Sequence, residues 1–507
     1  MHFDPKICAR ARLARDPRFD GRFFIGVLTT HIYCRPICPA RPPKEQNVRY
    51  FPTAAAAAEA GLRPCLRCRP ESSPGTPAWL GTSATVSRAL RLMNESVLEV
   101  GDMDAFAERL GIGSRHLRRL FLKHLGASPI AVAQTRRLHF AKKLIDESRL
   151  PMRDVAIASG FGSVRRFNAT FLKTYGRTPT QLRRASRPAA SVPNSGYRFL
   201  LRFRPPFSWV GLLEFLAPRA IPGIEIVEGQ TYRRVFSLEN HVGSIQATLD
   251  NASQSIVLSI HYPQPQWLFL IVERVRRLFD LSADPNEIGL HLRRDPLLTR
   301  QIAARPGVRV PGCWDGFELA IRAILGQQVT VQGATTLAGR MVRVFGVPIA
   351  SESGFTHLFP SPESLADADL GQIGLPRARA HCLRSLARAV CDGKIIFSGV
   401  TNLTDFLERF RELPGIGDWT AQYVAMRALG EPDAFPASDL GLLRATGLRD
   451  PRELQARAEA WRPWRAYATL YLWQPPLAVD PRRAALSPSL PAKEFRPRAA
   501  AGSLAVS

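Results

Sequence analysis

The 507-residue chain contains no apolar run close to the roughly 20 residues that a membrane-spanning helix needs. Its first residues, MHFDPKICAR, lack the apolar core of a secretory signal, so we expect a cytoplasmic protein with no membrane partner. Acidic residues are also few: 43 Asp plus Glu stand against 69 Lys plus Arg, which gives a formal net charge of +26. Such an excess of positive charge attracts polyanions and favours nucleic acid as the partner.

Cysteine is sparse, with eight in the chain, but four lie close together as C-x3-C at Cys34 and Cys38 and C-x2-C at Cys65 and Cys68. Two disulfides, a metal site and a reactive centre are each compatible with such a cluster. Disulfides are rare in the cytosol, and two close thiolate pairs are typical of a tetrahedral zinc site. We interpret the four scattered cysteines as packing or surface residues: Cys8, Cys313, Cys382 and Cys391.

The chain is too long for a single hydrophobic core, and its composition changes along its length. We predict a multidomain, mainly α protein in which one part is α+β. Two stretches rich in Pro, Ser and Ala, PESSPGTPAW and RRASRPAASVPNSG, are interpreted as linkers. The predicted parts are a small zinc domain, a tandem helix-turn-helix domain, a sheet-plus-helices domain, an all-α domain and a disordered tail, at residues 1–76, 80–187, 197–306, 307–478 and 479–507.

The third part mixes strand and helix patterns. TYRRVFSL and SIVLSI are rich in β-branched and aromatic residues and predict strands, whereas WVGLLEFL and WLFLIVERVRRLF predict helices. We expect an antiparallel sheet with helices on one face.

The second part contains an internal repeat. FLKHLGASP at Phe121 recurs as FLKTYGRTP at Phe171, and each copy is preceded by a helical pattern and a turn, at Gly111 and Gly160. A helix followed by a glycine-containing turn and a second helix is the pattern of a helix-turn-helix unit.

Ser114 and Ser163 lie where an N-cap would begin the second helix of each unit. Two ordinary helical hairpins with solvated arginines would give a similar pattern, but the duplication within a basic chain favours DNA binding. The side chains expected to face DNA are His116, Arg118, Arg119, Arg165 and Arg166.

The sequence around the first cysteine, VLTTHIYCRPICPAR, places Thr30, Arg35 and Arg41 where they can hold a phosphate beside a thiolate. A purely structural zinc knuckle would not need such neighbours. These residues therefore indicate that the zinc site also meets DNA.

Residues 3–185 resemble the N-terminal half of the Ada regulatory protein of the bacterial response to alkylation. The match rests on F-x-x-x-V-x-T-T-x-I-Y-C-R-P-x-C-x-A-R followed by R-P-C-x-R-C, and the repeated helices resemble the AraC family of activators. In the Ada family the first zinc-bound cysteine accepts a methyl group from a DNA methylphosphotriester. The resemblance therefore implies Cys34 as the methyl acceptor, with Cys38, Cys65 and Cys68 as the other ligands of one Zn²⁺.

The same resemblance implies a bacterial transcription activator at the nucleoid, whose partners are alkylated DNA, promoter DNA and RNA polymerase; we expect a monomer. Ada also carries a second acceptor in a Pro-Cys-His-Arg motif, which this chain lacks, because Pro64-Cys65 belongs to the zinc motif. Methyl transfer from O6-methylguanine is not expected.

The fourth part contains LPGIGDWTAQYVAMRAL, in which Gly415 and Gly417 allow a tight turn whose N–H groups can meet a phosphate. Such a turn also joins unrelated helices. About 20 residues on, FPASDLGLLRATG places Asp439 at the start of a helix, where an aspartate is usually an N-cap.

Together these two motifs resemble the helix-hairpin-helix glycosylases, and residues 197–476 resemble the AlkA type, which excises 3-methyladenine. The resemblance implies Asp439 as the catalytic carboxylate. It also implies that aromatic residues hold the base and that Gln328 fills the gap left in the duplex. Core packing is the alternative role for the aromatic residues, which are Trp419, Tyr423 and Trp473.

Glycosylases of this superfamily that also cleave the backbone have a nucleophilic lysine where this chain has Trp419. Since tryptophan cannot form a Schiff base, we predict a monofunctional glycosylase. The chain is thus interpreted as a methyl-switched activator joined to a DNA-3-methyladenine glycosylase. One alternative is a pure regulator whose glycosylase half is inactive; another is a repair enzyme whose front domains only localise it.

Overall fold

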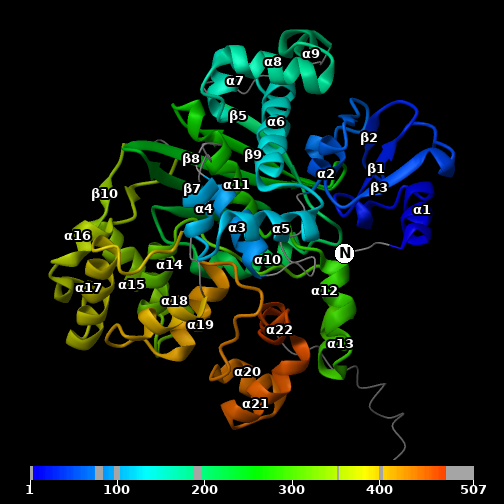
Figure 1. Ribbon diagram of the computed structural model, residues 1–507. Coiled ribbons are helices and arrows are strands. Elements are labelled where there is room, and N and C mark those ends of the chain that lie inside the picture. Colours follow the sequence, from blue (N-terminus) through cyan, green and yellow to red (C-terminus); the bar gives the residue numbers. More distant parts are fainter. Residues whose placement is uncertain are drawn as a thin grey trace, which may run out of the picture. The chain divides into compact units, whose positions relative to one another are not determined.

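The computed structural model describes residues 4–74, 84–95, 103–185, 196–350, 353–398 and 403–474. Figure 1 shows the ribbon with its elements labelled. The predicted disordered tail at 479–507, residues 75–79 of the first predicted linker and residues 186–195 of the second lie outside the described residues. Among the described helices, none is long and apolar enough to cross a membrane.

The cysteine-containing part is built on a small sheet with strand order β3-β1-β2-β4. Strand β1 pairs antiparallel with β2 and β3, and β2 pairs parallel with β4. Strand β2 ends at Cys34, and β4 leads directly into Cys65. The elements are α1 (Pro5–Leu13), β1 (Phe24–Val27), β2 (Ile32–Cys34), β3 (Val48–Phe51), α2 (Ala54–Glu59) and β4 (Arg63–Pro64).

The second part consists of helices, and the predicted repeat is present in it. Helices α4 and α5 form one helix-turn-helix unit, and α7 and α8 form the other; the second helix of each ends at a left-handed glycine, Gly126 or Gly176. The helices are α3 (Ala84–Glu95), α4 (Met103–Glu108), α5 (Ser114–Leu125), α6 (Pro129–Glu147), α7 (Met152–Ala158), α8 (Val164–Tyr175) and α9 (Pro179–Ala185).

The two predicted N-caps differ. Ser163 caps α8 and accepts the N–H of Arg166 on its hydroxyl at 3.4 Å, as predicted. The prediction for Ser114 is wrong: Gly113 is the N-cap of α5, and Ser114 is already the first helical residue. Gly113 takes the extended conformation of an N-cap. Helix α5 therefore begins at its serine, whereas α8 begins at the residue after its serine.

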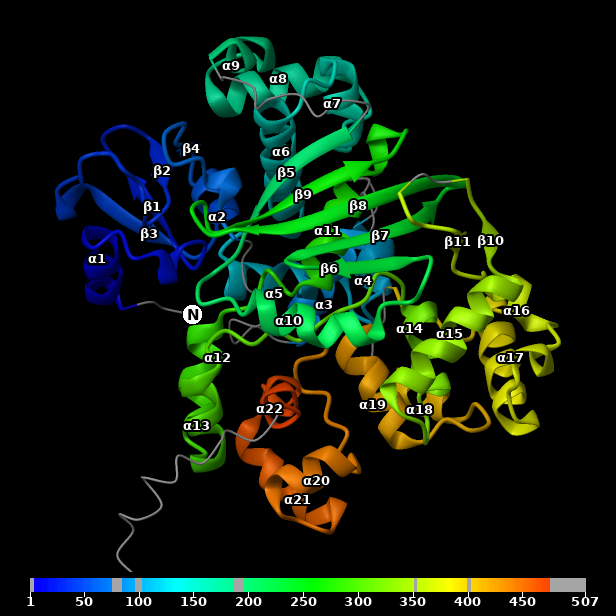
Figure 2. The ribbon, with the colours of Figure 1, turned by 180° about the vertical axis from the view of Figure 1, so that it is seen from behind.

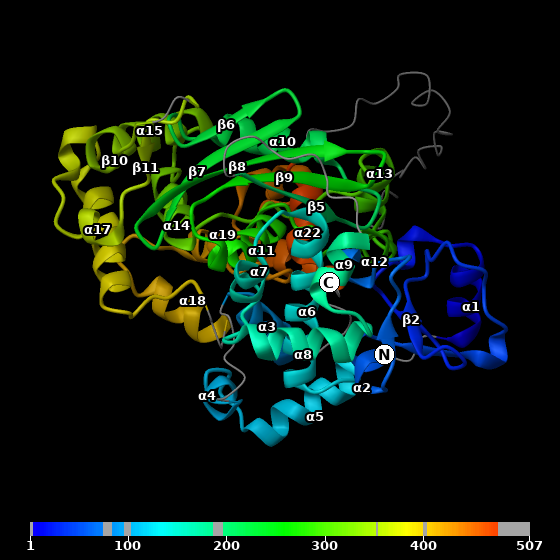
Figure 3. The ribbon, with the colours of Figure 1, turned by 90° about the horizontal axis from the view of Figure 1, so that it is seen from above.

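The third part contains a five-stranded antiparallel sheet with strand order β5-β9-β8-β7-β6 (Figure 2 and Figure 3). Alternate residues of β9, namely Ile256, Leu258 and Ile260, are fully buried in one core with helices α10 and α11, which confirms the predicted sheet with helices on one face. The elements are β5 (Gly196–Arg202), α10 (Trp209–Leu216), β6 (Glu225–Glu228), β7 (Thr231–Leu238), β8 (His241–Asp250), β9 (Ser255–His261) and α11 (Leu268–Leu278).

The described chain after α11, which begins inside the predicted third part (residues 197–306) and continues through the predicted all-α part, is helical apart from a two-stranded ribbon that the sequence did not indicate, β10 (Val347–Pro348) with β11 (His357–Leu358). Its helices are α12 (Pro285–Leu292), α13 (Pro296–Ala304), α14 (Gly316–Leu325), α15 (Val331–Phe345), α16 (Pro362–Ala366), α17 (Arg377–Cys391), α18 (Leu403–Arg411), α19 (Asp418–Arg427), α20 (Leu440–Thr446), α21 (Pro451–Ala458) and α22 (Arg465–Leu472).

Candidate metal centre and active site

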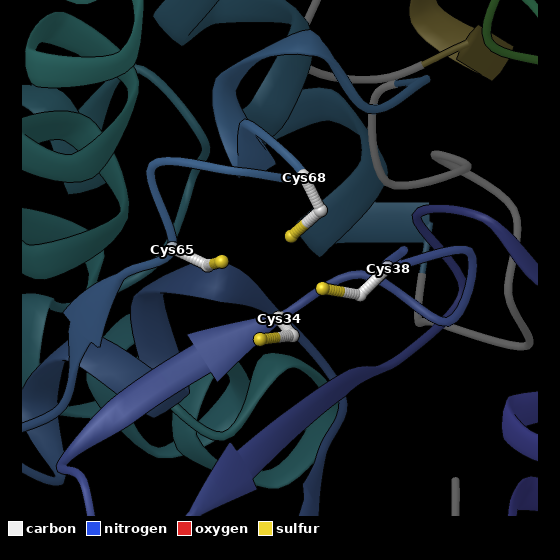
Figure 4. Close-up of side chains that lie close together, drawn as sticks. All are labelled: Cys34, Cys38, Cys65 and Cys68. Atoms are coloured by element: carbon white, nitrogen blue, oxygen red, sulfur yellow. The ribbon is translucent and has the colours of Figure 1, made fainter. Parts of the chain in front are cut away.

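The four clustered cysteines converge on one point, as Figure 4 shows. Their sulfur atoms all lie within 4.8 Å of one another. Cys34 ends β2, Cys38 follows in the next turn, and Cys65 and Cys68 follow β4, so the parallel pairing of β2 with β4 brings the two halves of the motif together.

This arrangement fits a zinc ion. Interaction with Cys38 and then Cys65 raises the pKa of Cys34, and interaction with Cys34 and the other two cysteines raises the pKa of Cys68. Four sulfurs this close cannot all be thiolates unless a cation offsets their charge. A tetrahedral Zn²⁺ is bound by such a set of sulfurs.

Arg35 does not have the role that the sequence suggested. It is buried and forms an ion pair with Asp20, with its Nε 2.8 Å from Oδ1. Its backbone N–H donates to the Sγ of Cys68 at 3.3 Å, and its guanidinium donates to the carbonyl of the same residue at 3.0 Å. Arg35 therefore braces the cysteine loops. Thr30 and Arg41 are exposed, and their contact with a phosphate stays a prediction.

The four other cysteines are packing and surface residues, as predicted. Cys8, Cys313 and Cys382 are buried, whereas Cys391 is exposed. Burial raises the pKa of these three thiols to about 11, 12 and 11 respectively. Because the thiolate is the nucleophilic form, burial disfavours reaction at Cys8, Cys313 and Cys382.

The second helices of the two helix-turn-helix units, α5 and α8, each have an apolar and a basic face. Leu117 and Phe121 of α5 are buried, as are Phe167 and Phe171 of α8. The residues predicted to contact DNA are all exposed on the opposite faces: His116, Arg118, Arg119, Arg165 and Arg166.

The predicted hairpin connects α18 to α19. Ile416 is buried and anchors the turn, while Gly415 and Gly417 on either side of it are exposed. Gly415 has φ +83°, a conformation that favours glycine. The amide of Gln327, which the sequence did not single out, donates to the carbonyl of Gly415 at 2.9 Å and so fixes the turn.

Asp439 is both an N-cap and the centre of a polar site. Its Oδ1 accepts the backbone N–H of Leu442 at 2.9 Å and thereby caps α20. The indole N–H of Trp473 donates to the same oxygen at 2.9 Å, and the indole N–H of Trp419 donates to Oδ2 at 2.8 Å. Three N–H donors thus hold this carboxylate in place.

The aromatic residues predicted to hold a base lie together at this carboxylate. The rings of Trp419 and Tyr423 are stacked, with centroids 5.2 Å apart and planes 10° apart. The Trp473 ring lies 6.2 Å from that of Tyr423 and is inclined at 44° to it. The hydroxyl of Tyr423 accepts a hydrogen bond from Arg427 at 2.6 Å. Burial acts to raise the pKa of Tyr423, but Arg427 and Arg219 outweigh it, and the pKa is lowered.

Gln328 and Gly441 are two further residues of this region. Gln328 is exposed between α14 and α15 with φ +58°, next to the residue that fixes the hairpin, and its role as a wedge stays a prediction. Gly441 was missed by sequence reasoning: a Cβ there would lie 2.9 Å from Oδ1 of Asp439. Only the folded geometry shows that a side chain at this position would press on the carboxylate of Asp439.

Four family models match successive segments of the chain. They are the metal binding domain of Ada at residues 7–71, a helix-turn-helix domain at 106–185, the AlkA N-terminal domain at 198–315, and the HhH-GPD superfamily base excision DNA repair protein at 321–465.

Curated relatives match the whole chain and each of its halves. The probable bifunctional transcriptional activator/DNA repair enzyme AlkA of Mycobacterium tuberculosis strain H37Rv is 42% identical over 483 residues, which are 93% of this chain and 97% of the relative. DNA-3-methyladenine glycosylase 2 of Escherichia coli K12 is 33% identical over 54% of this chain and 96% of its own. The bifunctional transcriptional activator/DNA repair enzyme Ada of the same strain is 32% identical over 34% of this chain and 47% of its own.

The chain combines a four-cysteine zinc centre, paired helix-turn-helix units and a helix-hairpin-helix site around Asp439. This combination defines a DNA repair protein that binds double-stranded DNA. Within that class, the chain belongs to the family of bifunctional transcriptional activator/DNA repair enzymes of the AlkA type. Its zinc ion is held by Cys34, Cys38, Cys65 and Cys68.

Proposed function

We propose that the chain excises alkylated bases such as 3-methyladenine at Asp439 and accepts methyl groups from DNA methylphosphotriesters on Cys34. Methylation of Cys34 then makes the protein active as a transcription activator. The observation that carries the first activity is the carboxylate held by the indole N–H groups of Trp419 and Trp473 at the end of an aromatic stack. RNA polymerase as partner, a monomeric state and a place on the bacterial nucleoid are parts of the same proposal.

Excision requires few groups because alkylation at N3 or N7 makes the purine cationic and a good leaving group. The base leaves the duplex stack, and its glycosidic C–N bond breaks with the electron pair going to the base. Asp439 stabilises the positive charge that develops on the sugar, and water then adds to the sugar carbon and loses a proton. The Trp419 and Tyr423 rings offer π-faces to the cationic base. Since Trp419 replaces the lysine of lyases, the backbone is left intact.

Methyl transfer forms a bond between the sulfur of Cys34 and the methyl carbon. The bond from that carbon to the phosphate oxygen breaks, and its electron pair stays on the oxygen, so the triester becomes an ordinary diester. Bound zinc supplies the positive charge that keeps the sulfur a thiolate at neutral pH.

The methylated centre has a different charge. Four thiolates with one Zn²⁺ carry −2, and conversion of one to a thioether leaves −1. Removing one charge at about 8 Å from a phosphate, at an effective dielectric constant near 40, relieves roughly 1 kcal/mol of repulsion. Several phosphates within this range would raise DNA affinity by one or more factors of ten. Equal promoter affinities for methylated and unmethylated protein across salt concentrations would exclude this switch.

The glycosylase assignment is tested with a matched pair of N-cap variants. Asp439 caps α20 and Asp450 caps α21, but of the two only Asp439 accepts indole N–H groups among the described contacts. Asparagine is as good an N-cap as aspartate, so neither substitution should unfold the protein. We expect Asp439→Asn to lower base release by about 10²-fold or more with DNA binding retained, and Asp450→Asn to leave release unchanged. Undiminished release by Asp439→Asn would show that Asp439 is not the catalytic carboxylate, whereas no release by the unsubstituted protein would favour an inactive glycosylase half.

A further inference from the structure

Strand β5 is an edge of the five-stranded sheet, since it pairs with β9 alone. An edge strand presents backbone N–H and C=O groups that another chain can bind. Here the backbone of Leu200 is bound by two side chains of helix α6. Its N–H donates to Oε2 of Glu147 at 3.2 Å, and its C=O accepts a hydrogen bond from Nζ of Lys143. Because these side chains are one helical turn apart, α6 replaces a neighbouring strand at this point.

Aromatic packing accompanies these hydrogen bonds. Phe140 of α6 is stacked on Phe199 of β5 with ring centroids 6.3 Å apart. It also meets Phe269 of α11 edge-on at 5.0 Å. Phe140 is 6% exposed and Phe199 is 0% exposed. Both rings are therefore largely removed from solvent at this contact.

The packing extends well beyond these rings. One hydrophobic cluster takes in buried residues of α6, α7 and α8 together with buried residues of β5, β7, β8, β9 and α11. A polar contact lies beside it, where Arg136 of α6 meets Glu273 of α11 at 3.3 Å. The second helix-turn-helix unit and the sheet thus share one core.

The interface leaves the predicted DNA-contacting residues accessible. Arg118, Arg119, Arg165 and Arg166 are exposed with α6 in place, and Asp439 takes no part in the interface. Binding of α6 to the sheet therefore competes neither with DNA binding by α5 and α8 nor with base excision.

We propose that α6 is a permanent cover for the edge of the enzyme's sheet. The regulatory half (residues 1–185) and the glycosylase half (residues 196–474) then remain bound to each other without the covalent connection through residues 186–195. In this arrangement the glycosylase carries α5 and α8 as a fixed second DNA-binding surface. The proposal rests on packing and holds whether or not either chemical activity is confirmed.

The test uses the full-length protein with a specific protease site in place of residues 188–193. After complete cleavage, the two halves are run on a sizing column at about 1 μM. At this concentration, halves that bind each other with a Kd well below 1 μM stay together. We expect them to elute together at the position of the uncut protein, both at low salt and in 1 M NaCl, because the hydrophobic cluster that the two halves share is not weakened by salt. Separation of the halves on cleavage would overturn the proposal.

Two variants locate the interface. Phe140→Glu places a charge in the shared core and should weaken the association of the cleaved halves at least about tenfold. Lys143→Met combined with Glu147→Gln removes the charged groups that bind Leu200 with little change in size, and should weaken association severalfold even if Phe140→Glu fails to fold. Gln134 is exposed on the same helix, so Gln134→Glu is the control and should have no effect. Association unchanged by both α6 changes would show that other contacts hold the halves together.

Discussion

At the scale of single residues, the proposed excision reaction depends on the indole N–H groups that hold Asp439. We expect Trp419→Phe, which keeps an aromatic ring but removes the donor to Oδ2, to lower kcat for base release by about tenfold or more, since one hydrogen bond to a charged group contributes roughly 1.5–3 kcal/mol. Trp461 donates its indole N–H to Asp295, which caps α13, at 2.8 Å and is the matched control. Single-turnover rates for both variants check this, and equal rates for Trp461→Phe and Trp419→Phe would contradict it.

Gly441 gives a second residue-scale prediction, in which a substitution lowers activity without lowering stability. Alanine is a better helix former than glycine, but its Cβ would lie 2.9 Å from Oδ1 of Asp439 and displace the carboxylate. We expect Gly441→Ala to keep or raise the melting temperature while base release falls by about tenfold, on the scale of other small displacements in active sites. The control is Gly289→Ala in α12, where the nearest atom is 3.6 Å away. Full activity of Gly441→Ala would show that the carboxylate position is not critical.

The residues of the site could be predicted from sequence, but their contacts could not. Asp439 and the three aromatic residues belong to recognisable motifs. Trp419, Asp439 and Trp473 are far apart in the chain, so only the fold shows that both indoles donate to one carboxylate. Arg35 illustrates the opposite error, since a basic residue next to a cysteine pattern turned out to be buried against Asp20.

At the scale of elements, the exposed arginines of α8 provide a test of DNA binding. We expect Arg165→Ala with Arg166→Ala to weaken affinity and to reduce the slope of log K against log salt concentration by about 0.9 for each DNA phosphate that the variant no longer neutralises. Arg388 is an exposed arginine of α17 that pairs with exposed Asp367, and Arg388→Ala should leave the slope unchanged. Titrations at three or more salt concentrations measure this. An unchanged slope in the α8 variant would show that these side chains do not bind DNA.

The buried hydrogen bond between Asp280, just after α11, and Tyr467 of α22 gives a prediction of how stability depends on pH. Oδ2 of Asp280 accepts the hydroxyl of Tyr467 at 2.8 Å, and burial raises the pKa of Asp280 to about 6, although Arg309 acts to lower it. A carboxyl whose pKa is higher in the folded state loses stability as pH rises, because the unfolded chain ionises first. Between pH 5 and 8 this loss is about 1 kcal/mol. We expect Asp280→Asn, measured by thermal melting against the unsubstituted protein, to gain relative stability over this interval; a constant difference would contradict it.

Elements with regular periodicity were predicted well. TYRRVFSL, rich in β-branched and aromatic residues, and the apolar run WVGLLEFL correspond residue for residue to β7 and α10. The two-residue strands β10 and β11 are too short to produce a pattern, and their pairing depends on the fold around them. The start of α5 differs by one residue because glycine can serve as an N-cap without a side-chain oxygen.

At the scale of the whole molecule, the sequence predicts the order of the parts along the chain but not that they pack against one another. The composition of RRASRPAASVPNSG predicts a linker but does not indicate how the parts on its two sides are arranged. The structure shows buried residues before and after that stretch in one hydrophobic cluster, with the chain up to Trp473 forming a single compact unit. Burial of an apolar helix face against a sheet encoded elsewhere in the chain leaves no local signal in sequence.

The central claim is that one chain holds two centres that act on alkylated DNA, each by a different reaction. The most direct measurement is to incubate the zinc-loaded protein with methylated DNA and to quantify free bases and S-methylcysteine in the same tube. We expect many bases released per chain and at most one methyl group per chain, located on Cys34, with Asp439→Asn abolishing only the release of bases. Methyl groups absent from Cys34, together with base release that persists in Asp439→Asn, would contradict the account.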